Sequence, residues 1–362
     1  AFVNPHVHLD KCLLYDLVPP NISGLDEEGI RNTLEYKAKR YTVDEVASRA
    51  GRCLEMAALN GATSIRAFAD IGPTGGLTPV RGLLKAKRDF AGVVDVQIAV
   101  IPQEGIICDP GAEEFMYKAM EEGADVVSGI PWFEWTDEDA RRHIDITFEV
   151  AKKFNADLHL LCDNTDDPSS RTLEYYAMKA IREKYHGRVT CSHATTLAAY
   201  NDTYAAKVIQ LVKQARMNMV NNTHIALWQG GRKDKQPIRR GITRVKELLA
   251  AGVNVSCGQD DVSDPYYPFG RMDPLEVGSF MVHTAQLGLP NEIETVYDML
   301  THNAAKILRL PNYGLDVGCN AELTIVDAPN AREALRLQPD RLYVIKAGRV
   351  IAETRTTRKL RK

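Results

Sequence analysis

Eight short apolar runs recur along the first 260 residues of the chain, and helical patterns separate them. The runs are rich in β-branched residues, as buried strands are, and the stretches between them have the spacing of amphipathic helices. Strands that alternate with helices form parallel sheets, and eight such units over about 270 residues match a (β/α)8 TIM barrel of the α/β class in size and order. The expected strands are Phe2–Leu9, Ala62–Asp70, Val94–Gln103, Ala124–Phe133, Ala156–Asp163, Arg188–His193, Met217–His224 and Val253–Asp260.

A doubly wound open sheet is the alternative to the barrel. The first expected strand is not followed by the GxGxxG pattern that binds dinucleotides in such sheets, and "GPTGG" at 72–76 is only a glycine-rich loop. Helical stretches such as "VDEVASRAGRCLEMAALNG" end at a glycine, which is typical of the position just past a helix. The pattern therefore favours the barrel.

The last part of the chain follows a different pattern. From about Asn320, "AELTIVDAP" and "LYVIKAGRVIAE" resemble strands, with a turn at Gly348. Because a pair of strands is marginally stable alone, we expect residues 311–362 to be the remnant of a small β-sandwich packed on a barrel domain of residues 1–310. The chain starts on the first barrel strand, so we expect the sequence to be truncated or processed, with partner strands preceding Ala1.

Composition restricts the classes of partner. A net charge of −3 gives no general attraction to nucleic acid or anionic membranes, and the sequence has no apolar run of eighteen residues that would span a bilayer. The seven cysteines are odd in number and lack CxxC spacing, which argues against a disulfide framework and predicts a reducing, cytoplasmic location. We expect a homo-oligomer that acts on a small molecule.

Polar residues collect where the expected strands end. In a (β/α)8 barrel the active site lies at the carboxyl ends of the strands. His6 and His8 share one face of the first strand and end it, as residues two apart do. Similar positions at later strand ends are taken by Gln103, Asp163, Asn164, His193, Asp260 and Asp261. Three histidines with carboxylates on one rim predict a metal site.

These residues, taken together, resemble the amidohydrolase superfamily. The segments "IPQEGI", "RVTCSHATT", "RRGITRVKELLAAGVNV" and "QDDVSDPYYPFG" are similar to bacterial cytosine deaminases in the same order, through nearly the whole chain. The resemblance implies that His6, His8 and Asp260 bind one divalent metal and that His193 contacts the water on that metal. It also implies that Gln103 holds the edge of the pyrimidine ring.

The chain departs from that family at four positions. Leu161 takes the place of a metal-binding histidine, and Asn164 takes the place of the glutamate that carries a proton to the ring, which an amide cannot do. Gln259 replaces a histidine, and Tyr266 replaces a tryptophan. The reaction of the family is therefore expected to be altered here.

We expect the metal to survive the loss at Leu161. Three protein ligands and a water suffice for a catalytic zinc, so the predicted ligands are His6, His8 and Asp260, with His193 as a direct fourth ligand. Asp163 is a possible further contact, whereas His159 is expected on the same face but deeper in the barrel. Zinc is the first choice of metal, and iron or manganese are the alternatives.

The sequence thus predicts a metal-dependent hydrolase that attacks a C–N bond of a small nitrogen heterocycle. Asp260 would act as the base with His193 beside it, and Gln103, Asn164, Asp261 and Tyr266 would bind the substrate. Two alternatives stay open: an amidohydrolase that opens a cyclic amide, and a metal-free ligand-binding relic of the family.

Overall fold

Eight parallel strands form the barrel that the sequence predicts. The computed structural model describes residues 1–23, 26–239 and 242–361. Neighbouring strands pair in chain order, and a parallel bridge between Val7 and Asp260 closes the sheet. The strands are β1 (Phe2–Val7), β2 (Ala62–Asp70), β3 (Asp95–Ile101), β4 (Val126–Gly129), β5 (Asp157–Cys162), β6 (Val189–His193), β7 (Asn218–Asn221) and β8 (Asn254–Cys257). The barrel prediction is confirmed, and the doubly wound alternative is wrong.

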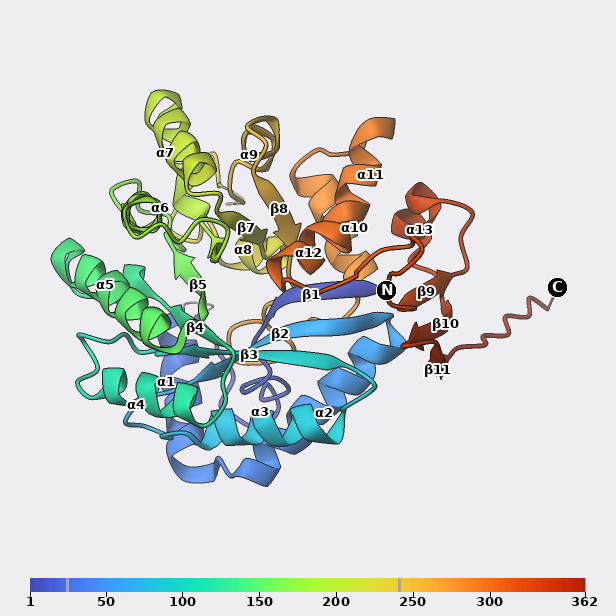
Figure 1. Ribbon diagram of the computed structural model, residues 1–362, viewed down its shortest axis with the longest axis horizontal. Coiled ribbons are helices and arrows are strands. Elements are labelled where there is room, and N and C mark those ends of the chain that lie inside the picture. The colour runs from blue at the N-terminus through green and yellow to red at the C-terminus, as the bar shows by residue number, and fades with distance from the viewer. Residues whose placement is uncertain (24–25, 240–241, 362) are drawn as a thin grey trace.

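Helices surround the strands (Figure 1). They are α1 (Asp26–Arg40), α2 (Val43–Leu59), α3 (Thr78–Asp89), α4 (Ala112–Glu121), α5 (Asp137–Phe154), α6 (Thr172–Arg182), α7 (Asp202–Gln214), α8 (Thr223–Gln229), α9 (Val245–Ala250), α10 (Pro274–Thr284), α11 (Pro290–Met299), α12 (His302–Ile307) and α13 (Ala331–Leu337). Helix α5 shows how local sequence sets the bounds: the Thr136 side chain accepts a hydrogen bond from Asp139 N, and Asn155 ends the helix at a positive φ of 50°.

Two apolar layers hold the barrel. The larger one lies between the strands and the helices, where side chains such as Leu54, Leu158 and Cys191 are fully buried. A smaller cluster fills part of the barrel interior and consists of Phe68, Ala99, Ile101, Val126, Ile130 and Leu161. Residues of β5 therefore alternate between the outer layer and the interior, as the period of two in a strand requires.

Several expected strands end earlier than the sequence predicted. The run 124–133 stops at Gly129, because Pro131 lacks an N–H and begins a 3-10 helix, Pro131–Phe133. The run 217–224 stops at Asn221, and His224 belongs to α8 instead. The candidate site residues consequently lie on the last two residues of a strand or in the loop beyond it.

The C-terminal strands form a small antiparallel sheet at the edge of the barrel (Figure 1). Its order is β11-β10-β9, with β9 at Leu323–Val326, β10 at Arg341–Lys346 and β11 at Arg349–Glu353. Lys346 ties the sheet to the barrel, since its Nζ donates to Thr63 O (3.1 Å) and pairs with Asp95 (2.8 Å). The expected small β-structure is confirmed, whereas the domain boundary at residues 310 and 311 stays a prediction.

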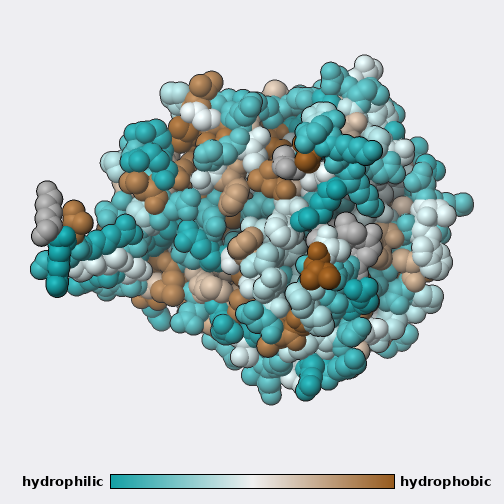
Figure 2. Space-filling model, turned by 180° about the vertical axis from the view of Figure 1, so that it is seen from behind, coloured by the Kyte–Doolittle hydropathy of each residue, from teal (hydrophilic) through white to brown (hydrophobic). Residues whose placement is uncertain are grey.

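The exterior carries no broad apolar face in the view of Figure 2, where hydrophobic residues form small, separated groups on a mostly hydrophilic surface. In the described part of the chain, none of the helices combines the length and the apolar character needed to cross a bilayer. All seven cysteines are free thiols, and five of them are buried.

Candidate metal centre and substrate cavity

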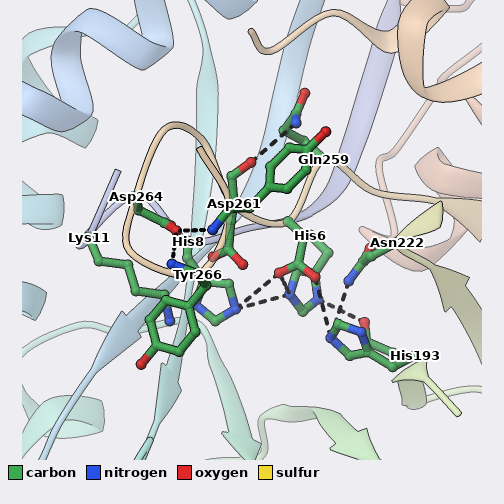
Figure 3. Close-up of polar contacts among 12 residues, drawn as sticks. His6, His8, Lys11, His193, Asn222, Gln259, Asp261, Asp264 and Tyr266 are labelled. Atoms are coloured by element: carbon green, nitrogen blue, oxygen red, sulfur yellow. Dashed lines mark hydrogen bonds and ion pairs between the residues drawn. The ribbon is translucent and has the colours of Figure 1, made fainter. Parts of the chain in front are cut away.

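Three ligand atoms meet where the first and last strands of the barrel come together. His6 Nε2 lies 3.2 Å from His8 Nε2, and Asp260 Oδ1 lies 3.1 Å and 3.3 Å from these two nitrogens. All three side chains are buried. Figure 3 shows His6 and His8 joined by the contact between their rings. Backbone hydrogen bonds fix their relative positions, because His8 N donates to Asp260 O and Asp260 N donates to His6 O, both at 2.9 Å.

The spacing of these atoms fits a metal ion. Ligand atoms of a tetrahedral zinc with bonds of about 2.0–2.1 Å lie about 3.3–3.4 Å apart, close to the three distances observed. Burial raises the pKa of Asp260, but His6 and His193 outweigh burial and hold it well below its ordinary range, so the carboxylate is ionised. Burial lowers the pKa of His8 well below its usual value, which keeps the imidazole neutral. A neutral imidazole and a carboxylate are the forms that bind metal.

A chain of buried groups orients His6 from below. The His6 ring stacks on Phe68 with centroids 4.0 Å apart, and His6 Nδ1 lies 2.7 Å from Ser192 Oγ. Ser192 Oγ also lies 2.7 Å from His159 Nε2. His159 thus lies deeper in the barrel than the ligand atoms, as predicted, and belongs to the support of the site.

The direction of these hydrogen bonds follows from Arg66, the last member of this series of buried groups. Arg66 Nη1 donates to His159 Nδ1 (3.2 Å), because a guanidinium has only donors. The neutral His159 therefore carries its proton on Nε2 and donates it to Ser192 Oγ. His6 turns Nδ1 toward this hydroxyl and Nε2 toward the ligand cluster, which is the arrangement that supporting hydrogen bonds give metal-binding histidines.

His193 lies beside the three ligand atoms and not among them. Its Nε2 is 3.5 Å from Asp260 Oδ2 and accepts a hydrogen bond from Asn222 Nδ2 (3.3 Å). Burial lowers the pKa of His193 to about 4, so the ring is neutral at neutral pH. The residue has a positive φ of 68°, and Asp260 has one of 62°. Such strained backbone, here at the carboxyl ends of β6 and β8, is typical of functional sites.

The end of β5 offers no ligand atom to the cluster. Leu161 is buried in the barrel interior, and Asn164 has no hydrogen-bond partner for its side chain among the described residues. The expectation that Asp163 is a further metal contact is wrong. A positive φ of 50° turns this residue away, and its carboxylate accepts from Thr172 N (2.8 Å), Ser170 Oγ (2.7 Å) and Tyr200 Oη (3.0 Å).

A cavity opens above the ligand cluster. The four residues predicted to bind substrate all line it, together with three of the predicted metal-site residues. Its wall consists of His8, Lys11, Ile30, Gln103, Ile130, Trp132, Phe133, Leu161, Asn164, His193, Ile225, Gln229, Asp260, Asp261 and Tyr266. His6 lies below this wall, and Gln259 is turned aside to His224, whose Nε2 is 3.0 Å from Gln259 Nε2.

Sequence reasoning missed some residues of this cavity. Lys11 belongs to the same "PHVHLDK" segment as the two histidines, but no role was given to it. Trp132 follows β4 and fits the strand-end rule, so that rule would have found it. Ile30 comes from α1, and nothing in the local pattern indicates that this helix reaches the cavity.

The chain is similar to known proteins in sequence and, for one of them, in structure. The chain is 34% identical to 5-methylcytosine deaminase from Klebsiella pneumoniae; its structure with 5-fluorocytosine has a TM-score of 0.95, covering 100% of this chain and 87% of that chain. It is 26% identical to N-isopropylammelide isopropyl amidohydrolase of Pseudomonas sp. (strain ADP), over 98% of this chain and 85% of the relative. It is 27% identical to pterin deaminase of Rhizobium rhizogenes, over 97% of this chain and 79% of the relative.

The family model described as "Amidohydrolase family" matches residues 23–352. The resemblance seen in the sequence is thereby confirmed, and so is the prediction of a hydrolase. The chain belongs to the amidohydrolase family.

Proposed function

We propose that this protein is a metal-dependent aminohydrolase that acts on a C–N bond of a small nitrogen heterocycle. The observation that carries the proposal is the group of three buried ligand atoms, 3.1–3.3 Å apart, beside a cavity at the carboxyl ends of the barrel strands. The similar proteins named above act on a pyrimidine, a triazine derivative and a pterin by their names, which supports a heterocyclic substrate.

In this proposal His6, His8 and Asp260 hold one divalent ion, zinc first and iron or manganese as alternatives. When bound, such an ion lowers the pKa of a water toward neutrality and polarises the bond that is attacked. We place His193 next to this centre on the Asp260 side and not as a fourth direct ligand, because its Nε2 faces the other carboxylate oxygen.

Asp260 is the proposed general base. Its Oδ2 has no hydrogen-bond partner among the described residues and is thus free to accept the proton of the attacking water. The neutral His193, held by Asn222, orients that water. Gln103, Asn164, Asp261 and Tyr266 hold the ring by hydrogen bonds and packing.

A change of substrate relative to cytosine deamination is part of the proposal. Protonation of a ring nitrogen needs an acid at the position of Asn164, and an amide is not one at neutral pH. For this reason the opening of a cyclic amide is the second candidate function, since its ring needs no proton from that position.

Metal analysis and a substrate screen test the proposal together. The purified protein should carry about one equivalent of zinc, iron or manganese, and removal of that metal should abolish turnover. The screen should cover pyrimidines, triazines, pterins, hydantoins and creatinine-like rings, with ammonia or amine release as the readout. A protein that binds heterocycles tightly without retaining metal would instead be the ligand-binding relic.

Cytoplasmic location and a homo-oligomeric state stay predictions. The seven free cysteines support the first. Cell fractionation would test the location, and light scattering would test the oligomeric state.

A further inference from the structure

A buried carboxylate connects two loops of the cavity and has no part in the proposed chemistry. Glu134 follows the 3-10 helix after β4, and its side chain is fully buried. Its Oε1 accepts hydrogen bonds from Ile106 N (2.6 Å) and Ile107 N (3.1 Å), and its Oε2 accepts one from Cys108 N (3.0 Å). Three successive backbone N–H groups of the loop after β3 therefore hold a carboxylate from the loop after β4.

His143 on α5 completes this connection. The ring is fully buried, its Nδ1 lies 2.6 Å from Glu134 Oε1, and its Nε2 accepts a hydrogen bond from Ile130 N (3.1 Å). Because a backbone N–H can only donate, the proton of the neutral ring lies on Nδ1 and is donated to Glu134. Burial lowers the pKa of His143 and favours this neutral form. Burial raises the pKa of Glu134, but the bonds from His143 and the backbone outweigh burial and lower it to about 2, so the carboxylate is ionised.

The backbone on both sides is shaped for this contact. A Cβ atom at Gly129, the last residue of β4, would lie only 2.3 Å from His143 Nε2. Gly105 has a positive φ of 91°, and a Cβ atom there would lie 2.4 Å from Cys108 Sγ and 3.0 Å from Glu134 Oε1. Each side therefore has a glycine where a side chain would push the partners apart. We call Glu134 and His143 the loop clamp.

The loop clamp joins segments that line the substrate cavity. The loop after β3 carries Gln103, and the turn after β4 carries Trp132 and Phe133. Trp132 lies between Ile130 and Glu134, the two residues of this turn that bond to His143. Trp132 and Phe133 also line an adjoining hollow, so they form part of the boundary between the two spaces. The position of this boundary thus depends on groups outside the cavity wall.

We propose that Glu134 and His143 are positioning residues of the substrate cavity. They join the loops after β3 and β4 and thereby hold Trp132 in its place on the wall before a substrate enters. Burial of both polar groups gives little net stability, because each loses its hydration, whereas their bonds fix one geometry of the two loops. The place where substrate binds is that of the proposed function, on which this inference rests.

Fluorescence of Trp132 tests the positioning without a substrate. The chain has three tryptophans, so Trp135→Phe with Trp228→Phe leaves Trp132 as the only one. In this background His143→Leu should raise the quenching of Trp132 by acrylamide at least about twofold, because the turn that carries it loses an attachment and opens more easily. Glu134→Gln should do the same, since either orientation of the amide turns its NH2 group toward a backbone N–H.

Amide hydrogen exchange tests whether the clamp couples the two loops. His143 forms no hydrogen bond with residues 106–108, yet in His143→Leu their amides should exchange at least about fivefold faster, because Glu134 loses a donor that fixes its carboxylate. His143→Gln keeps an acceptor within reach of Ile130 N, so it should recover part of the change in quenching and in exchange.

A core variant on the same helix separates positioning from stability. Ile144 follows His143 on α5 and is fully buried in the larger apolar layer, so Ile144→Ala lowers stability without removing a bond of the clamp. Its quenching and exchange should match those of the unmodified background. Unchanged quenching of Trp132 in both His143→Leu and Glu134→Gln, or an equal rise in Ile144→Ala, would overturn the inference. Glu134→Gln keeps the test decisive if His143→Leu folds poorly.

Kinetics connect the clamp to the proposed function. With a heterocycle that the screen shows to be turned over, both clamp variants should raise KM at least about tenfold, while kcat changes less than about threefold and the metal content stays the same. A loss of kcat at unchanged KM would contradict positioning. If the unmodified protein carries no metal and turns over no heterocycle, the proposed function fails, whereas quenching and exchange still decide whether the clamp positions the wall.

Discussion

The two sides of the cavity floor differ in chemistry. Where β1 meets β8, two imidazoles and a carboxylate converge within 3.3 Å. Where β5 ends, the cavity is lined by Leu161, which packs in the apolar interior, and by the uncharged Asn164. The contrast teaches that one side brings together three side chains of the kinds that bind metals, while the other lines the cavity with neither such a ligand nor an acid. Substitutions can alter one side at a time.

Removal of a ligand on the β1 side should have the largest effect. His6→Ala or His8→Ala should lose the metal and reduce turnover to background with the fold retained, because the barrel core below the site is unchanged. Metal by mass spectrometry, turnover and circular dichroism measure the three outcomes. His302→Ala, a change at an exposed histidine of α12, is the control. Stoichiometric metal in both site variants would contradict the ligand assignment.

Loss of the proposed base on the β8 side comes next. Asp260→Asn keeps an oxygen near the metal but cannot take a proton, so turnover should fall by about 10²–10⁴-fold with part of the metal retained. Steady-state kinetics of the metal-loaded variant measure this, with the exposed Asp298→Asn as control. A rate near that of the unmodified protein would move the base elsewhere, with Asp261 as the next candidate.

On the β5 side the experiment adds missing groups, whereas the two experiments above remove groups. Leu161→His with Asn164→Glu restores a ligand and a proton carrier, and cytosine or isocytosine deamination should appear, at least about tenfold above either single variant. Each single change leaves one function missing, and activity on the native substrate should fall in the pair. Ammonia release from each pyrimidine measures the gain. If the unmodified protein already deaminates cytosine at an ordinary enzymatic rate, the argument about Asn164 is wrong.

The smallest effect is expected below the cluster. Ser192→Ala removes the group between His6 and His159, so metal affinity should fall by about 10–100-fold. The free energy of unfolding should fall by about 1–3 kcal/mol, because His159 keeps a buried donor without an acceptor. Chelator competition and denaturant titration measure the two changes, and Ser192→Thr, which keeps a hydroxyl, should recover part of the affinity. Unchanged metal affinity in Ser192→Ala would show that Ser192 does not help to hold the metal ligand His6 in place.

Periodicity of the sequence was enough to predict the barrel, because eight buried strands and their helices repeat a pattern that has few other solutions. It also brought Gln103, His193 and Asp260 to one rim. It was wrong where the backbone leaves the strand conformation. Alternation places Asp163 on the inner face with Leu161, yet the positive φ turns Asp163 outward to the start of α6. His193 adjoins the inward Ser192, and a positive φ directs its ring to Asp260. Single-residue conformations of this kind have no signal in hydrophobic spacing.

The parallel bridge between Val7 and Asp260 would give the proposed metal centre a role in folding. The first and last strands are joined by few direct contacts, among them Gln259 N donating to Asn4 Oδ1 across 255 residues of chain. Because the proposed ligands lie on both sides of this junction, the site exists only when the two ends of the barrel have found each other. A bound ion would hold that long-range contact together, and it would favour the closed barrel by mass action over any form in which the ends separate.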